Sequence, residues 1–234
     1  MEIHLIETKY DWETQSIAEF LNEGNIPSGW FDFFNSETIR EILGKVSNEL
    51  EKKKDCKIFY PDLNQVFRAF YITPLENVKA VIIGMDPYHN GNAVGLCFSV
   101  KSGKSINPSL RSIYKELKME GFNPKENGNL IHWANQGVLM LNMSLSVEKG
   151  KAGSHSKIWK KFSEEVVKYL DKNRGEDIHW ILMGNDACKI KNLINKGVVH
   201  TTVHPMPLAE YKSSKIAEAF WGSGVFSRVK SIKW

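Results

Sequence analysis

Four short apolar runs recur along the chain, and polar, turn-forming residues follow each of them. The runs at 78–83, 138–141, 178–182 and 198–203 are rich in Val, Ile and Leu and predict buried strands. Around them, helical spacing or helix-start residues predict helices near 11–22, 33–54, 108–120, 130–135, 157–172, 186–195 and 213–220. Strands that alternate with helices imply right-handed crossovers and parallel pairing. The sequence therefore predicts a single α/β domain, with a central four-stranded parallel sheet and helices on both faces.

Chemically capable side chains stand where each predicted strand ends. Asp86 follows the first strand, Asn142 the second, Gly184 and Asn185 the third, and His204 the fourth. The carboxyl ends of parallel strands meet at one edge of a sheet, so we expect these residues to line one pocket. The ordinary alternatives are that Asp86 and Asn142 only form turns, and that His204 is a satisfied histidine at a strand end. The pattern alone leaves both interpretations open.

The composition limits the class of protein without selecting one. The chain has 234 residues, 42% of them hydrophobic and 25% charged, as is typical of a globular protein. Its net charge of +4 permits a polyanionic partner but does not require one. Three scattered cysteines offer neither a disulfide framework nor a Cys-x-x-Cys metal pair, and they favour a reducing compartment.

Targeting and membrane signals are not visible in the sequence. The N-terminus lacks the basic start and apolar stretch of a secretory signal. No apolar run approaches the roughly 20 residues that cross a bilayer. We therefore expect an intracellular protein of the cytoplasm or nucleus, monomeric and without a membrane partner.

Four motifs together carry a resemblance to a known family. They read VIIGMDPYH (81–89), VLMLNMSLSV (138–147), ILMGND (181–186) and VVHTTVHPMPL (198–208). In this order and spacing, the chain resembles the uracil-DNA glycosylases of family 1, the UNG type, from about residue 29 to near the C-terminus. Residues 1–28 match no known motif, and one interpretation is a lineage-specific N-terminal arm before the glycosylase-like domain at 29–234.

The resemblance implies roles for individual residues. Asp86 corresponds to the catalytic aspartate that stabilises the cationic sugar and orients water, and His204 to the histidine that donates a hydrogen bond to the departing uracil. Asn142 corresponds to the amide that reads the uracil edge, and Phe98, otherwise a core aromatic, to the ring that stacks on the base. Tyr88 corresponds to the wall that excludes the methyl group of thymine.

Further positions are implied to support the site or to hold DNA. His89 supports the catalytic loop, and the backbone at Met85 meets the uracil. The implied DNA-binding residues are Ser109, Gly184, Asn185, Pro205, Met206 and Leu208, the last being the wedge that fills the space of the extruded base. The resemblance implies neither a metal nor a cofactor.

The chain departs from the family pattern at several positions. Met85 stands where the family usually has Gln, Met206 replaces a Ser that contacts phosphate, and Asn185 replaces another Ser. The loop between His89 and Phe98 is one residue shorter, and the C-terminus is shorter than in typical members. Each lost phosphate contact would cost on the order of 1–3 kcal/mol if charge-assisted. We therefore expect an active enzyme whose DNA binding is weakened or altered.

Two functional hypotheses follow. The first is a monofunctional, metal-independent uracil-DNA glycosylase that flips uracil out of single- or double-stranded DNA and leaves an abasic site for base excision repair. The alternative is a glycosylase-fold DNA-binding or scaffolding module with weak or no catalysis, serving a partner such as a replication complex. A proteinaceous inhibitor is a further partner that the resemblance allows.

Overall fold

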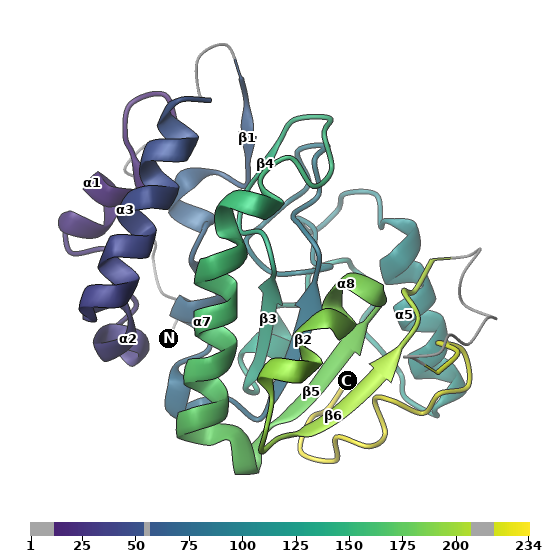
Figure 1. The fold of residues 1–234 in the computed structure, drawn as a ribbon. Coiled ribbons are helices and arrows are strands. Elements are labelled where there is room, and N and C mark those ends of the chain that lie inside the picture. The colour runs from purple at the N-terminus through teal and green to yellow at the C-terminus, as the bar shows by residue number, and fades with distance from the viewer. Residues whose placement is uncertain (1–11, 54–56, 207–217) are drawn as a thin grey trace.

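A parallel sheet forms the centre of the protein, which we describe from a computed structural model at residues 12–53, 57–206 and 218–234. Four strands lie in the order β3-β2-β5-β6 (Figure 1). They are β2 (Ala80–Gly84), β3 (Val138–Asn142), β5 (His179–Met183) and β6 (Val198–Thr202). The chain runs from β2 to β3 and then returns across β2 to β5, so the strand order reverses beside β2. Ligands of open α/β sheets bind at such a reversal.

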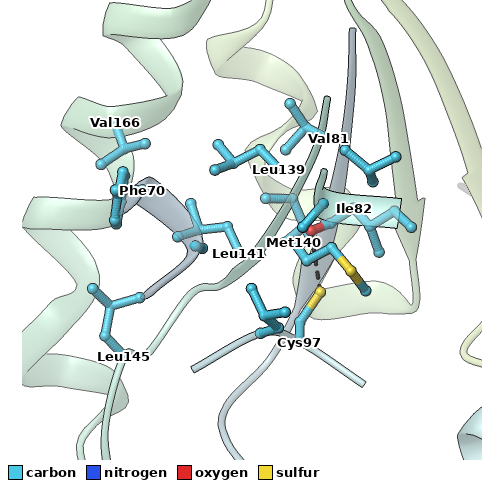
Figure 2. Close-up of a cluster of buried hydrophobic side chains, with 14 of the residues drawn as sticks. Phe70, Val81, Ile82, Cys97, Leu139, Met140, Leu141, Leu145 and Val166 are labelled. Carbon is cyan, nitrogen blue, oxygen red and sulfur yellow. Dashed lines mark hydrogen bonds between the residues drawn. The ribbon is translucent and has the colours of Figure 1, made fainter. Parts of the chain in front are cut away.

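The neighbouring strands β2 and β3 are buried along their whole length, although β3 lies at the edge of the sheet. Every residue of β2 and β3 is buried, and the register pairs Ala80 with Val138 at one end and Gly84 with Asn142 at the other. Burial on both faces explains why these strands read as continuous apolar runs rather than as alternating patterns. In the core close-up, Leu139 and Leu141 lie toward Val166 of the neighbouring helix, and Met140 lies toward Cys97 (Figure 2).

Helices cover both faces of the sheet (Figure 1). One side carries α7 (Ser156–Arg174) with α3 (Glu37–Glu51) packed against it, and α5 (Pro108–Met119) lies on the other side. The remaining helices are α1 (Ile17–Asn22), α2 (Phe31–Asn35), α4 (Arg68–Ile72), α6 (Ile131–Ala134) and α8 (Asn185–Cys188). The predicted fold class is thus confirmed.

The structure differs from the predicted elements at identifiable points. α1 begins at Ile17 rather than near residue 11, because Ser16 and Glu19 form a capping box. The helix predicted at 33–54 is split into α2 and α3 at Ser36, whose backbone is extended. The helix predicted to reach residue 195 comprises α8 and the 3-10 helix η5 (Lys189–Leu193). The two-stranded sheet of β1 (Phe59–Tyr60) and β4 (Val147–Glu148) was not predicted.

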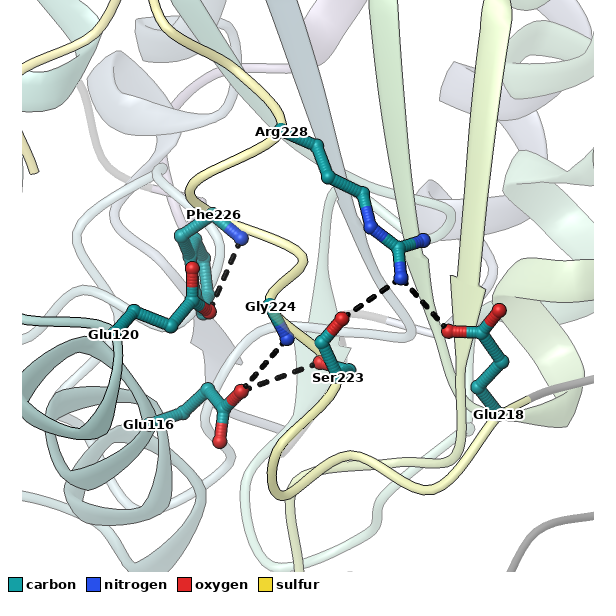
Figure 3. Close-up of polar contacts among 7 residues, drawn as sticks. All are labelled: Glu116, Glu120, Glu218, Ser223, Gly224, Phe226 and Arg228. Atoms are coloured by element: carbon teal, nitrogen blue, oxygen red, sulfur yellow. Dashed lines mark hydrogen bonds and ion pairs between the residues drawn. The ribbon is translucent and has the colours of Figure 1, made fainter.

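The C-terminal segment is tied to α5 by the buried carboxylate of Glu116 (Figure 3). Glu116 accepts hydrogen bonds from the amides of Gly222 at 2.8 Å and Gly224 at 3.2 Å. Within the segment, Arg228 bridges Glu218 at 3.1 Å and the Ser223 carbonyl at 2.8 Å. The bonds to Glu116 hold the segment against the body of the protein, and those of Arg228 brace the segment itself.

Two sequence predictions concern residues at the borders of the described regions. Most of the helix predicted at 213–220 lies outside the described residues, and the described Glu218 forms a β-bridge with Thr202 instead. In the predicted arm, Ile17 and Phe20 belong to the same buried cluster as the sheet, and the boundary at residue 28 stays a prediction. Within residues 12–53, 57–206 and 218–234, no helix has the length and apolar character needed to span a membrane.

Candidate active site

A cavity of 490 Å³ opens at the carboxyl edge of the sheet. It gathers side chains from the ends of all four strands and from the loops that follow them. Eleven of the sequence-predicted residues line it, namely Met85, Asp86, Tyr88, His89, Phe98, Ser109, Asn142, Gly184, Asn185, His204 and Met206. The expectation of one shared pocket is confirmed. Pro205 is buried without lining this cavity, and Leu208 lies outside the described residues.

Asp86 is the half-buried carboxylate of the cavity. β2 ends at Gly84, and Pro87 follows Asp86, which keeps the carboxylate on a turn rather than a helix. The Gly153 amide donates a hydrogen bond of 2.6 Å to Asp86 Oδ2. Burial raises the pKa of the Asp86 carboxyl above its ordinary value, against the opposing effects of the Gly153 bond and of nearby His89.

Asn142 lies at the end of β3, beside the end of β2. Its side chain is buried, with 7% of the residue exposed. It approaches β2 so closely that a Cβ at Gly84 would lie 2.4 Å from Asn142 Oδ1 and 2.9 Å from Cys97 Cβ. Gly84 is therefore required for space, and its absent side chain lets the Asn142 amide reach the cavity.

Phe98 and Tyr88 form an aromatic part of the wall. Phe98 has φ of 61°, a left-handed conformation that is strained for a bulky residue. The Tyr88 hydroxyl donates to the Phe98 carbonyl at 3.2 Å, and this bond helps to hold that conformation. The ring of Phe98 lies 6.2 Å from that of His204, centroid to centroid, at an angle of 46°. Strain of this kind concentrates at functional sites.

His204 follows β6 and faces the loop after β5. Gly184 has φ of 95°, and a Cβ there would come within 3.0 Å of His204 Cβ, so only glycine fits without displacement. Burial lowers the pKa of the His204 imidazole, while the charge of Asp186 opposes that change. His204 Nδ1 is buried and has no hydrogen-bond partner among the described residues. A neutral imidazole with an unpaired nitrogen is thus held at the cavity.

Met85 and Met206 line the cavity and are exposed. Met85 is 38% exposed and Met206 is 47% exposed. The Met206 amide donates to the His204 carbonyl at 2.7 Å, which makes a tight turn directly after the imidazole. Two exposed apolar side chains are therefore placed beside the polar groups of the cavity.

Sequence reasoning missed the contribution of the segment at 149–155. Its Ala152 lines the cavity and its Gly153 bonds Asp86. The His89 carbonyl accepts from the Gly150 amide at 3.0 Å, which ties the segment to the loop that carries Asp86. The signal in the sequence is the position of this segment, because it follows the second predicted strand, whose carboxyl end lies at the same sheet edge as the other polar strand ends.

Over the described parts of the chain, no cluster of three or more His, Cys, Asp or Glu side chains has the arrangement of a metal site. Cys97 and Cys188 are buried free thiols, and burial raises the pKa of both. The polar side chains that line the cavity are carboxylates, amides, imidazoles and hydroxyls.

Comparisons with known proteins agree with this geometry. The sequence model of the Uracil DNA glycosylase superfamily matches residues 70–222. A uracil-DNA glycosylase of Psychromonas ingrahamii is 41% identical over 210 residues, which cover 87% of this chain and 94% of that protein. One from Campylobacter curvus is 41% identical over 213 residues and covers 89% of each chain. The crystal structure of mimivirus uracil-DNA glycosylase superposes with a TM-score of 0.78 at 23% identity, covering 94% of this chain and 91% of that one.

Proposed function

This chain belongs to the uracil DNA glycosylase superfamily, and on that premise we propose how its cavity cleaves the bond between uracil and deoxyribose. The activity is that of a uracil-DNA glycosylase, a hydrolase of N-glycosyl bonds that acts in base excision repair. The base must leave the helix stack before it can enter a cavity of 490 Å³, and extrusion costs a few kcal/mol. The residues assigned below perform the chemistry after that step.

Asp86 stabilises the sugar as the C–N bond breaks. Positive charge develops on the deoxyribose during that step, and a fixed, half-buried carboxylate stabilises it more than water does. The hydrogen bond from Gly153 engages Oδ2 and limits rotation of the carboxylate. Oδ1 is then directed to the reacting carbon or to the attacking water.

His204 stabilises the departing uracil anion. Because burial lowers the pKa of His204, the imidazole is neutral at pH 7 and donates a hydrogen bond without having to lose its proton. The negative charge that forms on the uracil oxygen strengthens this bond in the transition state.

Asn142, Tyr88 and Phe98 select uracil. The Asn142 amide both donates and accepts, which matches the uracil edge and opposes the reversed pattern of cytosine. The Tyr88 ring crowds the position of a thymine methyl group, and Phe98 stacks on the base. A pocket contact alone distinguishes one methyl group by about 10- to 200-fold, so a rigid wall is needed. The Tyr88–Phe98 hydrogen bond supports that rigidity.

The convergence of Asp86, Asn142 and His204 on one cavity is the observation that carries the proposal. It is tested by single-turnover excision from an oligonucleotide with one uracil, with thymine and cytosine strands as controls. Asp86→Asn and Asn142→Ala should each lose about 100-fold or more, since each removes a preorganised polar contact. Asp177→Asn, at a carboxylate with a 75% exposed side chain, is the matched control and should match wild type.

The pH profile gives a second readout of Asp86. Excision requires the ionised carboxylate, so activity falls as the pH drops through the pKa of Asp86. Because this pKa is raised, the fall occurs at a higher pH than it would for an ordinary aspartate. DNA binding without excision in the wild-type protein would contradict the assignment and favour the scaffolding alternative.

The DNA phosphates are bound by Ser109, Asn185 and the turn after His204. The apolar side chains of Met85 and Met206 weaken this binding. We expect weak steady-state binding together with efficient single-turnover excision. A protein inhibitor that covers this edge is the second class of partner we propose, because a variant of mimivirus UNG, which has the same fold, was solved in complex with UGI.

A further inference from the structure

A second hollow, of 460 Å³, adjoins the active-site cavity. The two share Met85 and Asp186 as lining residues, so one opens beside the other. The second hollow lies between the first half of α7 and η5, which contact each other. Figure 1 shows α7 and the neighbouring α8 side by side on the same face of the sheet. We call this hollow the α7 groove.

The α7 groove has an apolar floor and a basic rim. Met143, Ile190 and Leu193 supply the floor. Lys157 and Lys160 come from the first two turns of α7, and their spacing of three residues puts them on one helix face. Lys189, at the start of η5, adds a third amine.

The rim charges extend into solvent. The side chain of Lys160 is 70% exposed, and that of Lys189 is 74% exposed. Lys160 lies 3.8 Å from Glu164, and Lys189 lies 2.5 Å from Asp186. Both acidic partners also line the groove, but ion pairs that are open to solvent are weak, so either lysine can turn to an outside anion at small cost.

The position of Lys157 is not explained by the stability of the helix. The amino end of α7 carries a partial positive charge, where acidic side chains are stabilising and lysines are not. The first turn of this fully described, 19-residue helix nevertheless contains Lys157 and no acidic residue. Three lysines against Glu164 and Asp186 leave the groove with a net charge of +1, and the helix end adds to that positive potential.

The position of the groove beside the cavity and the positive charge of the groove indicate which ligand it binds. A DNA strand whose uracil lies in the cavity must leave past its rim, with a negative phosphate at each nucleotide. Lysines bind such phosphates as point charges, and an apolar floor suits the sugars and bases between them. We propose that the α7 groove binds the strand on one side of the extruded nucleotide, with phosphates at Lys157, Lys160 and Lys189.

This inference rests on the proposed function, and its test separates the two. Wild type and K157Q/K160Q/K189Q would be assayed on a three-nucleotide substrate with central uracil and on strands extended by several nucleotides on the 5′ or the 3′ side. For each protein, the measurement is kcat/KM on the extended substrate divided by kcat/KM on the three-nucleotide substrate. K45Q/K52Q on α3 is the control, because the side chains of Lys45 and Lys52 are 73% and 70% exposed and lie outside both hollows.

Loss of three phosphate contacts should reduce the slope of log binding constant against log salt concentration by about 2, the change expected for three contacts to a single strand. Near 0.15 M salt, this corresponds to a ratio of kcat/KM about 10- to 50-fold lower than in wild type. We expect the loss for extension on one side only. An unchanged ratio and salt slope would overturn the proposal, as would an equal loss on both sides, which indicates diffuse attraction. Anisotropy with a uracil-free labelled strand keeps the groove testable even if wild type excises nothing, and thermal melting verifies that the variant is folded.

Discussion

Acid should destabilise this protein through one buried imidazole, His155. The residue is fully buried at the end of the segment whose Gly153 bonds Asp86. Its Nδ1 lies 2.9 Å from Ser146 Oγ, and that oxygen accepts the indole N–H of Trp159 at 2.8 Å. The Ser146 hydroxyl proton is then free to be donated to Nδ1, which requires a neutral ring. Nε2 has no partner among the described residues, so a second proton would bring an unpaired buried charge.

The size of the effect follows from the pKa of His155. Burial, with a smaller contribution from Lys53, lowers that pKa from 6.5 to about 4. The unfolded chain therefore binds the proton more tightly, and the stabilisation is complete above pH 6.5 and is lost as the pH falls toward 4. Because one unit of pKa shift corresponds to roughly 1.4 kcal/mol, the whole difference is about 3 kcal/mol. About 2 kcal/mol of it is lost between pH 7 and pH 5.

Urea unfolding followed by tryptophan fluorescence measures the free energy of unfolding at pH 7, 6 and 5. His155→Gln and His155→Phe should both be less stable at pH 7, since each disturbs the Ser146 network. Their stability should nevertheless fall by about 2 kcal/mol less than that of wild type over this range. Other titrating groups are common to all three proteins and cancel in that comparison. Equal pH slopes in wild type and both variants would refute the reasoning, whatever their stability at pH 7.

Three further substitutions test the site and its support. Gly84→Ala should lower kcat/KM for uracil by about 100-fold, because the added Cβ would lie 2.4 Å from Asn142 Oδ1. Gly44→Ala, where a Cβ meets nothing within 4 Å, should keep activity and raise stability by about 0.5–1 kcal/mol; loss of activity in both would indicate misfolding. Phe98→Gly and Phe98→Ala should lose excision to the same extent. The free energy of unfolding of the Ala variant should be about 1 kcal/mol lower than that of the Gly variant, because φ is 61° at this position. Equal stabilities of the two variants would argue against backbone strain. Glu116→Ala should lower the free energy of unfolding in urea by about 2–4 kcal/mol, since it leaves amides of the C-terminal segment without an acceptor. A smaller loss of stability in Glu116→Ala than in Glu116→Gln, which keeps an acceptor oxygen, would contradict this.

The fold class and the cavity could be predicted from local pattern. Strands buried on both faces read as apolar runs, and the parallel crossover rule places all their carboxyl ends at one edge. Polar residues after such runs, from Asp86 to His204, must then meet, although they are far apart in the chain. The four strands begin within two residues of their predicted starts for the same reason.

Other features were decided only by tertiary contacts. The Gly153 amide that holds Asp86, the carboxylate of Glu116 under the C-terminal segment, and the α7 groove each join residues that no local rule relates. The sequence by itself determined that the polar residues at the strand ends share one cavity, because strand burial and the direction of the crossovers follow from short-range chemistry. Only the tertiary structure decided the strand order and which donors, charges and rings surround each functional group, because those depend on how distant segments pack around the sheet.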